Sequence, residues 1–314
     1  MLFRSKSALN ASNKILMKKK FNDFKVSTPS YKVVSSLLNF YKELINFKKD
    51  FIIKPSIGRG SRGVYLLNTE MKKSYLKKFF MKSYYESEQR KVIIEEFLNG
   101  PQISTEGFFY KRKYKTIAYA DRNYSNLSKT KPYILENGGS MPSTIDNKIK
   151  EDIDKLIKKA CNAININWGT IKSDIVIHKN QPYIIELAAR ISGGYMASHS
   201  IPLIYNFDLI KYSIKECCNL KNNIPKIQRK TKLYMCQRFL FAKTGKIKMI
   251  RGINKIKKNK KIYFYNFYVK NGKYQKKIQS HSDRSGMIIA FSKSLKNAIR
   301  EANKYINNIK IKYY

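Results

Sequence analysis

The stretch FIIKPSIGRGSRGVYLLN, residues 51–68, decides the fold class of this chain. Two apolar runs that read as strands enclose a loop containing Gly58, Gly60 and Gly63. A dinucleotide-binding loop would lead into a helix, and a Walker A loop would end in Lys followed by Ser or Thr. Here the chain continues from Val64 as a second strand, so both of those phosphate-binding folds are disfavoured.

Lys54 precedes the glycine loop, on the first of the two strands. This order suits a flap whose backbone N–H groups near Gly60, Ser61, Arg62 and Gly63 close over phosphates while Lys54 reaches them from below. An ordinary hairpin whose glycines only supply positive φ fits this stretch equally well.

A second sequence pattern, further along the chain, favours the flap. The segment SDIVIHKNQPYIIELAAR, residues 173–190, reads as two strands joined by Asn180-Gln181, with Asp174 on one strand and Glu186 on the other. A hairpin can bring the two carboxylates side by side, where they need a cation between them. The alternative is a pair of buried acids satisfied by Arg190 and other arginines.

The net charge of +43 is the most prominent compositional feature. It indicates a polyanionic partner such as RNA, DNA or an acidic membrane surface. The lysines are spread through almost every segment, however, so a nucleic-acid role is disfavoured. No apolar run approaches the roughly 18 residues that cross a bilayer. The four cysteines form no CxxC pair, and we expect a cytoplasmic protein without zinc or disulfides.

Helical and strand patterns alternate irregularly along the chain. Residues 12–21 read as a helix capped by Ser12 or Asn13, residues 92–98 as a strand, and residues 101–125 as a hairpin around a basic turn. Further expected elements are strands between 231 and 280 and a closing helix at 292–309. Strands come in hairpins with helices between them, which predicts an α+β fold.

In order along the chain, four stretches resemble the ATP-grasp superfamily, specifically its carboxylate–amine (and carboxylate–thiol) ligases. They are SNKILMKKKF, FIIKPSIGRGSRGV, VIIEEFLNGPQIS, and SDIVI followed by PYIIELAARISGG. The stretch ELAARISGGYMASHSIPL is most similar to the carbamoyl-phosphate-synthase-like or carnosine-synthase-like branch. The resemblance implies an ATP-grasp fold with two α+β subdomains that grip nucleotide between a lid hairpin and an antiparallel sheet. It also implies an N-terminal helix remnant (1–26), a lid subdomain (27–94) and a C-terminal subdomain with the metal site (95–314).

Residue roles follow from the same resemblance. Its implied nucleotide-binding residues are Lys14, Lys54, Gly60, Ser61, Arg62, Gly63, Glu95, Glu96, Leu98 and Gln102. Of these, the two lysines hold phosphates, the backbone of Glu95, Glu96 and Leu98 reads adenine, and Gln102 meets the ribose. Asp174 and Glu186, with Glu106, hold Mg²⁺, while Arg190 and Lys54 act on the transferring phosphoryl group.

The resemblance therefore implies a Mg²⁺-dependent enzyme that uses ATP to activate a carboxylate for attack by an amine or thiol and releases ADP. Gln102 stands where many relatives have an acid, and Ala188 where many have asparagine. Lys14 lies close to the start, where relatives have a separate domain of roughly a hundred residues. The alternatives for this difference are a naturally short chain, a fragment of a longer protein, or a partner that supplies that domain; a homodimer is also compatible with the sequence. The alternatives are a non-catalytic or partial ATP-binding module and a basic nucleic-acid-binding protein.

Overall fold

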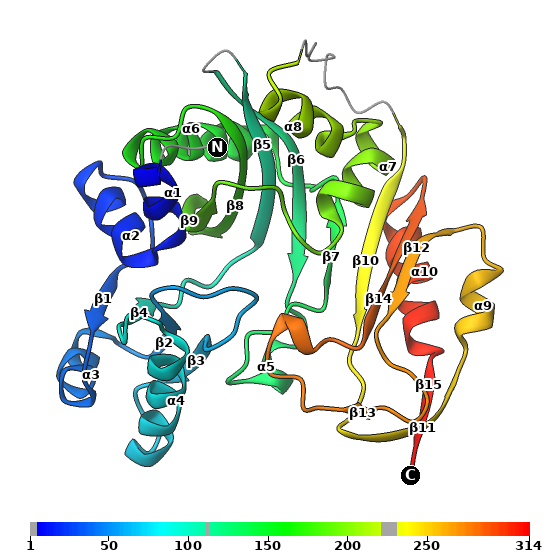
Figure 1. Ribbon diagram of the computed structural model, residues 1–314, viewed down its shortest axis with the longest axis horizontal. Helices are drawn as coiled ribbons and strands as arrows, with labels where there is room; N and C mark the ends of the chain where they lie inside the picture. Colours follow the sequence, from blue (N-terminus) through cyan, green and yellow to red (C-terminus); the bar gives the residue numbers. More distant parts are fainter. Residues whose placement is uncertain (1–4, 111–112, 221–230) are drawn as a thin grey trace. The chain divides into compact units, whose positions relative to one another are not determined.

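The structure is a computed structural model that describes residues 5–110, 113–220 and 231–314 (Figure 1). The chain divides into two compact units, which are described separately. The first comprises Met1–Ile117, Asn126–Leu135 and Ile145–Ile191, and the second comprises Ala118–Ser125, Glu136–Thr144 and Ser192–Tyr314. This is a different partition from the three segments expected from the sequence, and their roles as subdomains stay predictions.

The first unit contains every residue predicted to bind nucleotide or metal. Its helices are α1 (Ser5–Ser12), α2 (Lys14–Asp23), α3 (Leu37–Glu43), the short 3₁₀ helix η1 (Leu44–Asn46), α4 (Lys73–Glu86), α5 (Leu127–Thr130) and α6 (Asn147–Ala163). Its strands are β1 (Tyr31–Val34), β2 (Asp50–Pro55), β3 (Tyr65–Asn68), β4 (Val92–Glu96), β5 (Gln102–Tyr110), the start of β6 (Lys113–Asn123), β8 (Gly169–His178) and β9 (Gln181–Ala188).

A small antiparallel sheet carries the glycine loop. Its strand order is β1-β4-β2-β3, and β2 and β3 pair directly, with Ile53 opposite Tyr65. Helix α4 packs on this sheet (Figure 1), and the core between them contains Phe40, Phe51 and Phe80, with the rings of Phe40 and Phe80 stacked at 4.9 Å. Burial of such large side chains stabilises the sheet that holds Lys54.

Four antiparallel strands of the first unit, part of a larger eight-stranded sheet, carry the predicted metal residues. They lie in the order β6-β5-β8-β9, and α6 packs against β9. The β8–β9 hairpin turns at Lys179 and Asn180, which both adopt positive φ (49° and 59°), as the two central residues of a type I′ turn do. The predicted junction at Asn180-Gln181 is therefore wrong by one residue, because Gln181 already pairs with His178.

The second unit contains the end of β6 and the following elements: β7 (Gly138–Met141), the π-helix η2 (Met196–Ser200), α7 (Ile201–Tyr205), α8 (Leu209–Cys217), β10 (Tyr234–Leu240), β11 (Gly245–Arg251), α9 (Ile253–Lys257), β12 (Ile262–Phe267), β13 (Tyr274–Gln275), η3 (His281–Asp283), β14 (Gly286–Ser292), α10 (Leu295–Asn307) and β15 (Lys310–Tyr313). Four of its strands lie in the order β12-β14-β10-β7, with the end of β6 beside β7. Apolar residues of β10, β14 and α10, including Cys236, Ile288 and Ala298, form its core.

The predicted α+β class is confirmed, with two local corrections. The closing helix ends at Asn307 and is followed by β15, which pairs with β11. A short helix, α9, lies among the strands expected between 231 and 280. The basic turn of the β5–β6 hairpin falls at residues 111–112, outside the described residues. Within the three described ranges, no helix combines the length and apolar character needed to span a membrane.

Candidate active site

Helix α2 presents two lysines to the interior. Asn13 caps it, since its side-chain oxygen accepts hydrogen bonds from the backbone N–H groups of Ile15 (2.9 Å) and Leu16 (3.2 Å), which confirms the second of the two predicted caps. The buried residues Lys14, Met17, Lys18 and Phe21 follow at helical spacing and share one face. Asn13 therefore sets the start of α2, and with it the position of the face that contains Lys14 and Lys18.

Lys14 lies between the glycine loop and the predicted metal strand. Its Nζ donates to the backbone oxygen of Gly58 at 3.1 Å and lies 3.9 Å from Glu186 Oε1, and its backbone N–H donates to Ser56 O at 2.9 Å. Burial lowers the pKa of Lys14, and nearby Lys54 lowers it further, against the opposing effect of Glu186. The helix, the loop and the acidic sheet therefore converge at this side chain.

Lys54 shares a carboxylate with a second lysine. Its Nζ lies 2.6 Å from Glu95 Oε2, while Lys18 Nζ lies 2.8 Å from Glu95 Oε1. All three side chains are buried. Burial alone would raise the pKa of Glu95, but the two ammonium groups outweigh it and lower that pKa. Glu95 is therefore a carboxylate bridge between α2 and β2, a role different from the backbone reading of adenine that the resemblance implies.

The predicted acidic pair is confirmed as a geometric feature. On adjacent strands, Asp174 and Glu186 are direct register partners, and Ser104 of β5 is opposite Asp174 on its other side. Ser104 Oγ donates to Asp174 Oδ1 at 2.5 Å, and the ammonium of Lys172 is paired with Asp174 Oδ2. One row across three strands thus presents a hydroxyl and two carboxylates on the same face of the sheet.

This row fits a divalent cation. Carboxylate oxygens are the ligands Mg²⁺ prefers, and a magnesium ion bound with a nucleotide needs only one or two of them, because phosphates and water complete its shell. Glu106 is buried and lies opposite Lys172, two residues further along the ladder and so in the next row on the same face of the sheet. Among the residues the structure describes, no three Asp, Glu, His or Cys side chains come together as a metal cluster. Metal binding by Asp174 and Glu186 stays a prediction that this geometry fits, and so does the role of Glu106.

The glycine loop joins β2 to β3 and is exposed at its tip. Gly60, Ser61 and Gly63 adopt positive φ (63°, 61° and 68°), and Arg62 Nε lies 3.4 Å from Glu86 Oε1. A side chain at Gly63 would place its Cβ 3.0 Å from that of Glu86. The absence of a helix directly after this loop, predicted from the sequence, is confirmed by β3. Contact with phosphates stays a prediction.

The other predicted nucleotide-binding residues lie at the end of β4 and beyond it. Glu96 is exposed and accepts a hydrogen bond from Ser30 Oγ at 2.9 Å, Leu98 is buried, and Gln102 begins β5 opposite Val176. Arg190 is exposed, and its guanidinium donates to the oxygen of Ile191 at 3.0 Å. The structure thus brings the buried residues Lys14, Lys54 and Glu95 together with the partly exposed Glu186, and among the described residues Arg190 forms no hydrogen bond or ion pair with them.

Three residues that contact the predicted site were not themselves predicted: Lys18, which pairs with Glu95, and Ser104 and Lys172, which both contact Asp174. Lys18 belongs to the run Lys18-Lys19-Lys20, in which only the helical period distinguishes it, because it shares a face with Met17 and Phe21. Ser104 and Lys172 emerge only from the strand register. A sequence signal existed for the first of these residues alone.

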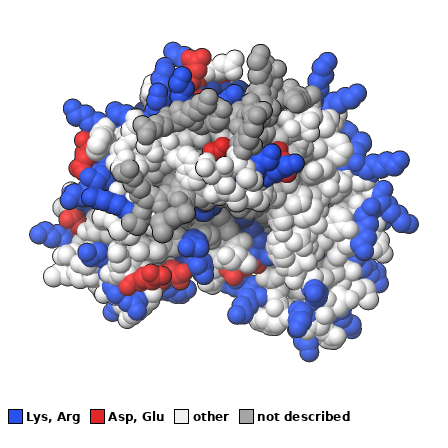
Figure 2. All heavy atoms as spheres, turned by 45° about the horizontal axis from the view of Figure 1, so that its top comes forward, with Lys and Arg blue, Asp and Glu red and all other residues white. Residues whose placement is uncertain are grey.

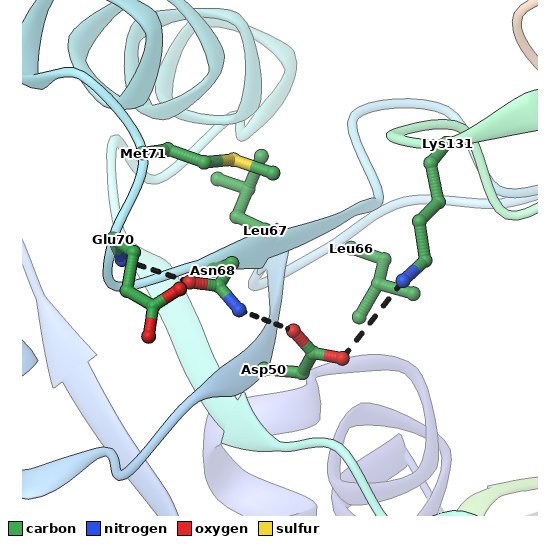
Figure 3. Close-up of a pocket in the computed structure, with 7 residues that line it drawn as sticks. All are labelled: Asp50, Leu66, Leu67, Asn68, Glu70, Met71 and Lys131. Carbon is green, nitrogen blue, oxygen red and sulfur yellow. Dashed lines mark hydrogen bonds and ion pairs between the residues drawn. The ribbon is translucent and has the colours of Figure 1, made fainter. Parts of the chain in front are cut away.

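A surface hollow of the first unit lies elsewhere. It is lined by Asp50, Leu66, Leu67, Asn68, Glu70, Met71 and Lys131, and Figure 3 shows Asp50 between Asn68 and Lys131. Asp50 and Asn68 pair at the end of the β2–β3 ladder opposite to the glycine loop. This hollow is therefore separate from the lysine and carboxylate cluster.

The cap of α2 can be tested by substitution. We expect Asn13→Ala to lower the free energy of unfolding by about 1 kcal/mol, because two backbone N–H groups lose their acceptor. Asn13→Asp keeps the capping oxygen but loses the hydrogen bond that Asn13 Nδ2 donates to Gln89 Oε1 at 3.0 Å, so it should recover only part of this loss. Ser12→Ala is the control, since Ser12 is exposed and does not cap α2. Urea denaturation measures all three, and an equal loss in Ser12→Ala would contradict the assignment of the cap.

Comparison with known proteins places this geometry in a family. A family model described as "ATP-grasp domain" matches residues 11–194, and one described as "L-amino acid ligase C-terminal domain 2" matches residues 238–314. Phosphoribosylamine–glycine ligase of Methanococcus maripaludis is 24% identical over 298 residues, covering 89% of this chain and 66% of that protein. Alanine–anticapsin ligase of Bacillus subtilis is 28% identical over 235 residues, covering 68% and 48%.

Solved structures agree on the fold. L-amino acid ligase from Bacillus licheniformis superimposes with a TM-score of 0.79 at 16% identity, covering 98% of this chain and 74% of that chain. Phosphoribosylglycinamide synthetase from Anaerococcus prevotii gives 0.67 at 21% identity, with coverages of 100% and 77%. The chain spans about half to two thirds of the length of the curated relatives it matches. With a family match over more than half of its residues, the chain belongs to the ATP-grasp family.

Proposed function

We propose that this chain catalyses, alone or as part of a longer protein, an ATP-dependent ligation that releases ADP. A substrate carboxylate attacks the γ-phosphorus of ATP, giving an acylphosphate and ADP; an amine or thiol then attacks the acyl carbon, forming an amide or thioester and expelling phosphate. The observation that carries the proposal is the contact of the buried Lys14 side chain with both the glycine loop and the partly exposed Glu186, within an ATP-grasp fold.

The chain's own residues supply positioning and charge. Lys14 and Lys54 are the proposed phosphate ligands, since phosphoryl transfer depends mainly on in-line placement and neutralisation of the phosphate oxygens. Gly60, Ser61, Arg62 and Gly63 would cover the phosphates with backbone N–H groups. Asp174 and Glu186 would hold Mg²⁺, which when bound supplies Lewis-acid stabilisation of the phosphate oxygens.

The remaining assignments concern the nucleotide and the substrates. The backbone from Glu95 to Leu98, at the end of β4 and just after it, is the proposed adenine site, and Gln102 the ribose site. Arg190 is proposed to bind the substrate carboxylate or the transferring phosphoryl group, and its exposed guanidinium keeps donors free of ion pairs with the described residues. Glu106 is proposed as a further acid beside the metal. Cytoplasmic location and partnership with another chain or a second copy stay predictions.

An amino acid is the favoured substrate class. The names of both curated ligase relatives contain an amino acid, and residues 238–314 match an L-amino acid ligase domain. The screen therefore pairs amino acids as carboxylates and amines with Mg-ATP, and measures ADP. Failure of every pair to release ADP, with nucleotide binding intact, would favour the partial ATP-binding module.

Nucleotide binding is tested directly by thermal unfolding. If Mg-ATP binds with 100-fold excess over its Kd, the folded state gains about 2.7 kcal/mol, which for a chain of this size raises the Tm by about 5 °C. RNA is the comparison, because Lys and Arg side chains are dispersed over the surface seen in Figure 2. Salt-sensitive stabilisation by RNA, without any by Mg-ATP, would support the nucleic-acid alternative instead.

A further inference from the structure

The ion-pair cluster of Lys18, Glu95 and Lys54 has a net positive charge. One carboxylate lies between Lys18 Nζ at 2.8 Å and Lys54 Nζ at 2.6 Å, so the buried trio has a surplus of one positive charge. Lys14 lies close enough to interact electrostatically with both Lys54 and Glu95. A surplus charge in a buried site is costly unless an anion balances it.

The two lysines of the bridge differ in access. The Lys18 side chain is fully buried, whereas that of Lys54 keeps 5% of its exposure. Lys54 is the next-to-last residue of β2, which leads into the glycine loop. Lys18 is therefore fully enclosed and closed to a ligand, whereas Lys54 is not completely enclosed. Burial lowers the pKa of Lys18 to about 8, which leaves the ammonium mostly protonated at pH 7.

Lys18 is held in place from the opposite side. Its Nζ is hydrogen-bonded to Thr28 Oγ1, and Thr28 Oγ1 in turn donates to the backbone oxygen of Ile184 at 2.7 Å. Ile184 lies on β9, the strand of Glu186. A continuous series of polar contacts thus runs from β9 through Thr28, Lys18 and Glu95 to Lys54.

We propose that Lys18 and Thr28 are positioning residues for nucleotide binding: Lys18 neutralises Glu95, so that Glu95 can hold the Lys54 ammonium in place while that ammonium keeps its charge for a phosphate of ATP. Without Lys18, Glu95 and Lys54 form a balanced pair and the attraction for the phosphate falls. This inference deepens the proposed function and rests on it.

The test is the affinity for Mg-ADP, measured by isothermal titration calorimetry. We expect Lys18→Met to weaken binding by about tenfold or more, the effect of losing one charge-assisted interaction at a buried site. Lys19→Met is the matched control, since Lys19 is the next residue and exposed, and should bind as the parent does. Thr28→Val should also weaken binding, and Thr28→Ser, which retains the hydroxyl, should restore it.

A double-mutant cycle separates this role from a general loss of structure. In a Lys54→Met background, Lys18→Met should change the affinity by less than about twofold, because the ammonium it serves is absent. Equal losses in both backgrounds would overturn the inference, as would parent-like binding by Lys18→Met. If Lys18→Met does not fold, the Thr28→Val and Thr28→Ser pair decides in the same way. Failure of the parent itself to bind Mg-ADP would overturn the proposed function together with this inference.

Discussion

Replacement of Glu186 by alanine should reduce ADP release about a thousandfold, which corresponds to the several kcal/mol that a bound metal ion contributes to charge stabilisation. Glu186 is one of two carboxylates that meet across β8 and β9. Its removal leaves Asp174 as the single acid of the row, and Asp174 is already paired with Lys172 and Ser104. The rate is measured with the substrate pair found in the amino-acid screen.

The same variant should fold normally. Glu186 retains 35% of its side-chain exposure, and its ion pair with Lys14 spans 3.9 Å, so its loss should change the free energy of unfolding by less than about 1 kcal/mol. Glu88→Ala is the control for activity, because Glu88 is an exposed carboxylate of the same unit. Parent-like turnover by Glu186→Ala would show that the metal is bound elsewhere.

Replacement of Glu95 by glutamine should lower the free energy of unfolding by about 3–5 kcal/mol, the typical cost of removing one partner from a buried ionic cluster. The neutral amide leaves Lys18 and Lys54 buried without a carboxylate. Guanidinium denaturation at pH 7 measures the loss, and the midpoint should fall with an unchanged slope.

Glu96→Gln provides the matched comparison. This residue is the neighbour of Glu95, but it is exposed and accepts one hydrogen bond from Ser30. We expect its substitution to alter the free energy of unfolding by no more than about 0.5 kcal/mol. Similar losses in the two variants would mean that the bridge contributes no more to stability than a surface carboxylate does.

The sequence predicts those parts of the site that a local pattern specifies. Lys54 precedes a glycine loop between two apolar runs, and Asp174 and Glu186 interrupt apolar strands, so each stands out from its neighbours. Lys18 is distinguished only by its helical spacing with Met17 and Phe21, because two more lysines follow it in the same helix. The bridging role of Glu95 depends on a contact between α2 and β4, which no local pattern contains.

Short elements in lysine-rich segments were the least predictable part of the fold. Helix α9 has five residues, of which Ile256 is buried, too few to establish a period. Strand β15 directly follows α10, and its alternating Lys and apolar residues form a strand because they pair with β11. Pairing with β11, which is distant in sequence, therefore decides that residues 310–313 form a strand and that α10 ends before them.

The irregularity in the β8–β9 ladder determines the chemistry of the sheet. Near the turn, Ile175 pairs with Ile184, and continuing that register would put Ile185 opposite Asp174. The register shifts there by one residue, so Glu186 takes that position instead. One extra residue therefore reverses which face each later side chain of the strand lies on, and places a second carboxylate, in place of an apolar side chain, beside Asp174.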